Sequence, residues 1–245
     1  MLEDSPEICI AENICAEDAR ISSWEIDYSD DRSLDNWNQK LGLMCEPDWK
    51  GAILGSALIF SQLLTLPILP PLADKYGRRH FFLGGRLFEM ILYTILMFTE
   101  SWYVMLGVMI GWGLASTTRL TIGLTYLVEL YPKNQQTRII VFCFSESAVI
   151  YILCTVYFWQ VGKDWFNFVA VGYTLCILSL IVSFMVPESP RTLFALGRIE
   201  EGKNALDFMA KINRRPAFDW NKIDLSVVHR CLENQKERFV FRQID

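Results

Sequence analysis

The chain has 245 residues, of which 52% are hydrophobic, with a formal net charge of −5 and a mean hydropathy of +0.23. The apolar residues fall into about five blocks of spanning length rather than into amphipathic stripes, which excludes a soluble enzyme and predicts an all-α integral membrane protein. No basic patch with interleaved aromatic residues occurs, so nucleic acid is not expected as a partner.

Residues 1–48 form an acidic segment with 13 acidic and three basic side chains and no apolar run long enough to span a bilayer. The segment has no basic stretch followed by an apolar core, so we expect neither a signal peptide nor a first spanning helix in it. Three of the seven cysteines, Cys9, Cys15 and Cys45, lie here. Two of them can form a disulfide if the segment faces an oxidising compartment.

Residues 49–189 are predicted to form a bundle of about five membrane-spanning helices. The expected spans are approximately 51–72, 81–99, 102–130, 139–160 and 165–187. In the third span, Gly107 and Gly111 stand at i and i+4, a spacing that predicts close helix packing. The two histidines, His80 and His229, lie outside the spans, and no spacing of cysteine or histidine predicts a metal site or a cofactor.

A short charged turn is predicted after the first span. It contains Leu72, Asp74, Lys75, Gly77, Arg78 and Arg79 at fixed spacing. This pattern resembles the loop between the second and third helices of the major facilitator superfamily, although Pro70 stands where that family has its first glycine. The resemblance implies a twelve-helix transporter fold in which this turn belongs to a cytoplasmic gate.

Two further stretches resemble the sugar-porter and organic cation/anion transporter branches of the same superfamily. The end of the third span contains Tyr126 and Glu129, followed by Pro132 and then Arg138. The fifth span ends in the pentapeptide 187–191, Pro-Glu-Ser-Pro-Arg, which includes Glu188 and Arg191. These branches place charged gate residues at comparable positions.

The resemblance implies ion pairs that close the inner side of the bundle and break when it opens. We expect Asp74 to pair with Arg138, and Arg78 or Arg79 to pair with Glu129. The simpler alternative is a basic loop that only fixes the orientation of the chain in the membrane.

Two charges are predicted within spans, Arg119 in the third and Glu146 in the fourth. A charge near the centre of a bilayer costs about 2.5–3.5 kcal/mol, so each should face the bundle interior or a water-filled cavity. The two residues either pair and hold neighbouring helices together, or contact substrate or a proton.

The turns after the first, third and fifth spans carry the basic residues, which predicts that they face the cytoplasm. Residues 1–48 are therefore expected to be extracytoplasmic and residues 190–245 to form a cytoplasmic helical linker and tail. Ala205, Phe208, Met209 and Ile212 recur at helical spacing in this tail, and a weaker amphipathic pattern covers 228–239.

The resemblance covers about 45–215 and corresponds to helices two to six of the superfamily fold. It implies a secondary transporter of a small organic solute, such as an organic cation, anion or sugar, of which the chain is a fragment, a truncated form or one assembling part. The alternative is a non-transporting scaffold, sensor or regulatory subunit. Expected partners are the solute, the lipid bilayer, and the missing second half or another copy, in the plasma membrane or an endomembrane vesicle.

Overall fold

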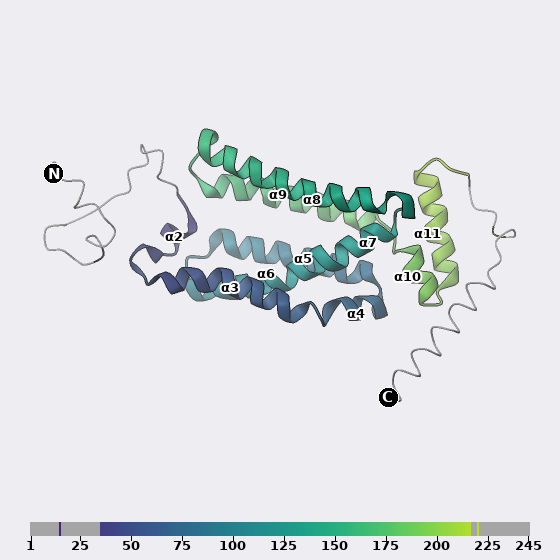
Figure 1. Ribbon diagram of the computed structural model, residues 1–245, viewed down its shortest axis with the longest axis horizontal. Helices are drawn as coiled ribbons and strands as arrows, with labels where there is room; N and C mark the ends of the chain where they lie inside the picture. Colours follow the sequence, from purple (N-terminus) through teal and green to yellow (C-terminus); the bar gives the residue numbers. More distant parts are fainter. Residues whose placement is uncertain (1–14, 16–34, 217–219, 221–245) are drawn as a thin grey trace, which may run out of the picture. The chain divides into compact units, whose positions relative to one another are not determined.

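The computed structural model describes residue 15, residues 35–216 and residue 220. Cys9, Cys231 and the amphipathic pattern predicted over 228–239 lie outside the described residues. Between 35 and 212 the elements are helical (Figure 1), with one isolated β-bridge between Asp35 and Asp164. The all-α fold predicted from the sequence is therefore confirmed.

The helices follow one another closely along the chain. They are α2 (Trp37–Lys40), η1 (Leu43–Cys45), α3 (Asp48–Thr65), α4 (Leu69–Tyr76), α5 (Arg78–Phe98), α6 (Trp102–Thr117), η2 (Thr118–Gly123), α7 (Leu124–Glu129), α8 (Lys133–Val156), η3 (Tyr157–Val161), α9 (Trp165–Met185), α10 (Pro190–Ala195) and α11 (Ile199–Ile212). The η2 and η3 segments are π-helical turns that continue α6 and α8.

Three of the described helical stretches are long and apolar enough to cross a membrane: α5, α8 with η3, and α9. The pair of α3 and α4 makes a fourth if it is counted as one broken span. The predicted third span, 102–130, is divided among α6, η2 and α7. These apolar helices make the chain a multi-pass membrane protein.

Prolines account for two differences from the predicted elements. The first predicted span is broken at residues 66–68, which include Pro67. Pro70 and Pro71 stand in the first turn of α4. A proline is tolerated there because the first turn leaves its N–H groups unbonded in any case. Helix α4 then continues to Tyr76. Only Gly77 lies between α4 and α5, where the sequence predicted a longer charged turn.

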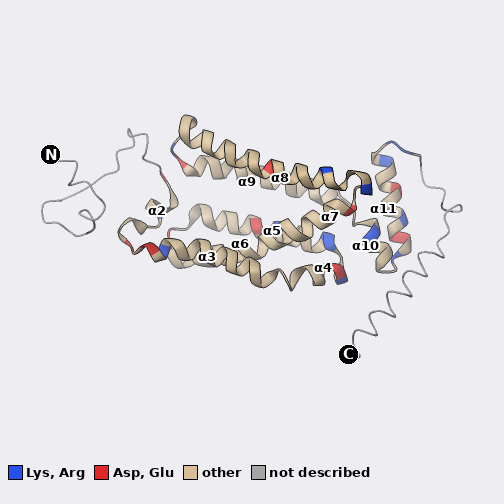
Figure 2. Cartoon of the chain, viewed as in Figure 1, with Lys and Arg blue, Asp and Glu red and all other residues tan. Residues whose placement is uncertain are grey.

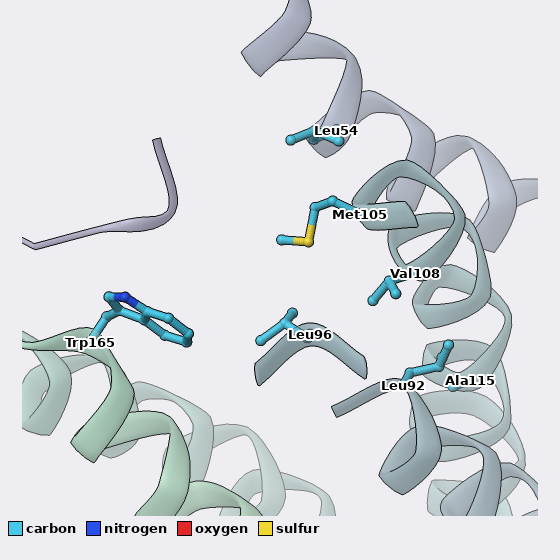
Figure 3. Packing of buried hydrophobic residues seen from close by; sticks show 7 residues of the cluster. All are labelled: Leu54, Leu92, Leu96, Met105, Val108, Ala115 and Trp165. Atoms are coloured by element: carbon cyan, nitrogen blue, oxygen red, sulfur yellow. The ribbon is translucent and has the colours of Figure 1, made fainter. Parts of the chain in front are cut away.

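The contacts divide the chain into two compact units. Unit 1 contains residues 1–65, 88–115 and 141–179, and unit 2 contains residues 66–87, 116–140 and 180–245. The core of unit 1 is an apolar cluster from α3, α5, α6 and the start of α9. Its buried members are Leu54, Leu92, Leu96, Met105, Val108, Ala115 and Trp165, and Figure 3 shows Leu54, Met105 and Leu96 turned toward a shared interior that Trp165 faces from another side.

Two contacts within unit 1 hold the short helix α2 against α9 and α5. Trp37 packs on Trp165 with 5.6 Å between ring centroids, and the Lys40 Nζ donates to the Met97 carbonyl at 2.7 Å. These contacts hold α2 against the start of α9 and the end of α5. Separately, a disulfide joins Cys15 to Cys45, both of which precede α3.

Close packing of α3 on α6 depends on Gly113. A Cβ atom built at Gly113 would lie 2.2 Å from the Leu58 carbonyl oxygen, whereas one at Gly107 would have nothing within 4 Å. The Ser61 hydroxyl donates to the Ile110 carbonyl at 2.6 Å in the same contact. The close approach of α3 to α6 therefore lies at Gly113. Of the predicted pair, Gly107 has no close neighbour, whereas Gly111 packs against α5, where a Cβ atom would lie 3.0 Å from the Leu92 side chain.

We expect Gly113→Ala to lower the free energy of unfolding by about 1–3 kcal/mol, because the added methyl group meets backbone atoms that cannot move aside without separating the helices. The matched change Gly107→Ala in the same helix should be neutral, or stabilising by about 1 kcal/mol or less. Thermal unfolding in detergent compares the two variants. Equal effects would show that α3 and α6 are not in close contact at Gly113.

Candidate functional site

Three separate segments of unit 2 converge on the carboxylate of Glu129, the last residue of α7. Arg78, at the start of α5, approaches it with its Nη1 at 2.7 Å. The Ser189 and Thr192 hydroxyls, at the start of α10, donate to it at 2.9 and 3.0 Å. The Glu129 side chain is only 12% exposed, so this carboxylate is held by a nearly complete set of donors.

Ser189 has a second role because it is the N-cap of α10. Its hydroxyl accepts a hydrogen bond from the Thr192 N–H at 3.3 Å, and Pro190 follows at the first helical position. Serine before proline is a favoured way to start a helix. The local sequence thus fixes the turn that presents both hydroxyls to Glu129.

The second carboxylate, Glu188, binds the beginning of α5. Its oxygens accept the Arg79 backbone N–H at 3.2 Å, and Oε1 also accepts the Ser189 N–H at 3.1 Å. A carboxylate is favourable at a helix N-terminus, where the first N–H groups have no partner within the helix. Glu188 therefore links the segment that follows α9 to the first turn of α5.

Gly77 is required by both its backbone angle and its neighbour. It has a φ of +106°, a region that side chains other than glycine rarely adopt. A Cβ atom here would lie 2.8 Å from the Glu188 Oε2. Glycine lets the chain turn from α4 to α5 while leaving room for the carboxylate.

Side chains of α5 and α7 bind carbonyl groups at the end of α9 and just after it. The Arg79 guanidinium donates to the Val186 carbonyl at 2.8 Å and to the Phe184 carbonyl at 2.9 Å, and the Tyr126 hydroxyl donates to the Pro187 carbonyl. A cation and several donors here satisfy the carbonyl groups that a helix C-terminus leaves unbonded.

Arg78 is shared between two carboxylates. It approaches Asp74 and Glu129 at 2.8 and 2.7 Å, so the predicted pairing of Arg78 with Glu129 is present. The predicted pairing of Asp74 with Arg138 is absent, because Asp74 lies four residues before Arg78 and pairs with it instead. Arg138 and Arg191 are exposed.

We use the name inner latch for eight residues of unit 2: Asp74, Gly77, Arg78, Arg79, Glu129, Glu188, Ser189 and Thr192. Figure 2 shows the charged residues of unit 2 gathered around α4, α7, α10 and α11. Ser189 and Thr192 were not among the predicted site residues. The Ser-Pro pair before α10 is the signal that could have identified Ser189.

The two predicted intramembrane charges fall in different units, Arg119 in unit 2 and Glu146 in unit 1. Arg119 lies within the π-helical segment η2, and both side chains are exposed. π-Helical turns inside α-helices are frequent at functional sites. Among the described residues, no group of three histidine, cysteine or acidic side chains could hold a metal ion.

Comparison with known proteins gives one family and several relatives. The model of the Major Facilitator Superfamily matches residues 49–230. The chain is 25% identical over 172 residues to Putative transporter SVOPL of Danio rerio, covering 68% of this chain and 33% of that protein. It is 25% identical over 179 residues to Solute carrier family 22 member 16 of Homo sapiens, covering 73% and 30%.

A third relative comes from plants. Putative sugar transporter ERD6-like 13 of Arabidopsis thaliana is 27% identical over 161 residues, covering 63% of this chain and 31% of that protein. The chain therefore spans about a third of the length of the curated relatives it matches.

Proposed function

The chain belongs to the Major Facilitator Superfamily, and from this premise we propose that it forms part of a secondary transporter of a small organic solute, such as an organic cation, anion or sugar. The printed names of its relatives, which include a solute carrier of family 22 and a sugar transporter, support these solute classes. In this fold the solute site lies between two helical bundles.

The observation that carries the proposal is the convergence of α5, α7 and α10 on Glu129. An alternating-access transporter needs contacts that close one side of the membrane and can be broken again. The inner latch has the required property, because each member of its central ion pair keeps a second partner when the pair opens. Arg78 retains Asp74, and Glu129 retains the hydroxyls of Ser189 and Thr192.

Because Arg78 and Glu129 each have a second partner, separating them costs less free energy. Breaking a buried ion pair is expensive when one charge is left without a partner. Here Asp74 is 58% exposed and lies at the solvent side of Arg78, so Arg78 can move toward water while still paired. The latch thus acts as a switch between two paired arrangements rather than as a permanent clamp.

The orientation that we propose places the inner latch and residues 190–245 in the cytoplasm, and residues 1–48 outside. The alternation of basic turns supports it. The disulfide between Cys15 and Cys45 also supports it, because disulfides persist in oxidising compartments. Arg119 and Glu146 are then proposed as solute or coupling-ion contacts, since charges in spans are expensive unless they face a cavity.

Uptake measurements test this function. Cells that express the protein from its complete coding sequence should accumulate at least one labelled organic cation, organic anion or hexose saturably. Glu129→Ala should reduce that uptake at equal surface expression, because it removes the residue on which the latch is centred. If the protein reaches the surface and carries no saturable flux of any class, it is a scaffold or regulatory protein with the transporter fold.

A further inference from the structure

Helix α11 buries one face and exposes the edge beside it. Gly202, Ala205 and Ala210 are buried, and Gly202 lies against the Phe194 ring of α10. Phe208 and Ile212, one turn apart, are 41% and 64% exposed. Residues four apart lie on the same side of a helix, so the two form a short apolar strip next to the packed face.

The end of α11 carries three exposed basic residues, Lys211, Arg214 and Arg215. The helix ends in a turn in which the Arg215 N–H bonds the Ala210 carbonyl and Arg214 adopts a φ of +53°. Glycine or asparagine usually occupies this left-handed position.

The acidic side chains of α11 each have a partner. Glu200 pairs with Lys203 at 2.8 Å, Glu201 pairs with Arg198 at 2.5 Å, and Asp207 accepts a hydrogen bond from the Trp220 indole at 3.2 Å. Glu200 and Glu201 are therefore compensated by basic residues near the start of α11, and only Asp207 remains to offset the three basic residues at its end.

Phe208, but not Ile212, lines a cavity of about 540 Å³ within unit 2. The lining also includes Met185, the last residue of α9, and several charged side chains, namely Arg79, Glu188, Arg198 and Glu201. Met185 is 72% exposed and is the last residue of a 21-residue candidate membrane span, so it marks the boundary of the hydrocarbon region. Figure 1 shows α11 running across the direction of the last turns of α9, which is the orientation of a helix lying along a membrane surface.

We propose that α11 is an interfacial helix that docks on an anionic lipid surface. Phe208 and Ile212 enter the boundary between headgroups and acyl chains, and Lys211, Arg214 and Arg215 bind lipid phosphate and carboxylate groups. The inference uses the multi-pass character of the chain and does not depend on transport.

Hydrogen exchange of the full chain in lipid nanodiscs tests the proposal. Amides of α11 should exchange more slowly in an equal mixture of phosphatidylcholine and phosphatidylserine than in phosphatidylcholine alone. Each basic residue at an anionic surface contributes about fivefold in the docking equilibrium, so the three together should contribute on the order of a hundredfold.

The decisive variant combines Lys211→Gln, Arg214→Asn and Arg215→Gln. Asparagine tolerates the left-handed conformation, so this variant keeps the helix end while removing the charge. It should lose the response to phosphatidylserine, whereas Lys133→Gln, an exposed basic residue at the start of α8, should keep it. Equal exchange of wild-type α11 in the two lipids overturns the proposal, as does equal protection in detergent, which would mean that protein contacts alone hold the helix.

Discussion

Replacing Glu129 with alanine is expected to lower the free energy of unfolding of the detergent-solubilised chain by about 2–4 kcal/mol, because a largely buried carboxylate that accepts from three donors is lost while Arg78 keeps Asp74 as a partner. The change leaves Arg78, whose side chain is 18% exposed, without its inner partner. It also leaves the Ser189 and Thr192 hydroxyls without the carboxylate that accepts from both. Chemical unfolding followed by tryptophan fluorescence measures the loss.

Glu200→Ala is the matched control for this measurement. It removes the same charge from a side chain that is 81% exposed and pairs with Lys203 three residues away, so it should cost only about 0.2–0.5 kcal/mol. A loss at Glu129 as small as the loss at Glu200 would mean that the carboxylate does not hold α5, α7 and α10 together.

Gly77→Ala is expected to be the second most damaging change. The backbone at φ +106° costs about 1–3 kcal/mol for a residue with a side chain. The new methyl group also meets the Glu188 Oε2, so the end of this side chain must shift and its hydrogen bonds to the start of α5 weaken. Both effects act in the same direction, so we expect a total of about 3 kcal/mol, measured by the same unfolding experiment.

Gly197→Ala is a control for a glycine that has a positive φ but no close neighbour. Gly197 also has a positive φ, +75°, but a Cβ atom there would have nothing within 4 Å. It should therefore show only the conformational cost, about 1–2 kcal/mol. If Gly77→Ala costs no more than Gly197→Ala, the position of Glu188 against Gly77 is not what makes glycine necessary.

The fold class could be predicted because long apolar blocks with few charged residues are visible directly in the sequence. The position of the chain break in the first span did not follow as directly. Pro67, Pro70 and Pro71 all signal an end, and only the structure shows that α4 starts again after the break and reaches Tyr76. Asp74 lies in this helix, four residues before Arg78, and pairs with it rather than with Arg138.

The candidate site was predictable where charged residues stand in a recognisable motif, and less so where hydroxyls complete it. The motif predicts that Arg78 or Arg79 pairs with Glu129, and the structure shows the pair with Arg78. Ser189 and Thr192 reach Glu129 only because α10 starts at Pro190, a boundary that depends on local capping. The π-helical turn around Arg119 has no signal in hydrophobicity, since one wider turn leaves the apolar pattern almost unchanged.

The coupling free energy between Arg78 and Glu129 tests the inner latch most directly. Unfolding is measured for Arg78→Gln, Glu129→Gln and the double variant, so that each side chain is neutralised with little change of shape. Because the two atoms are 2.7 Å apart, the latch predicts that the second substitution costs less once the first is present, with a coupling of about 1–3 kcal/mol. Additive losses within about 0.5 kcal/mol would contradict it.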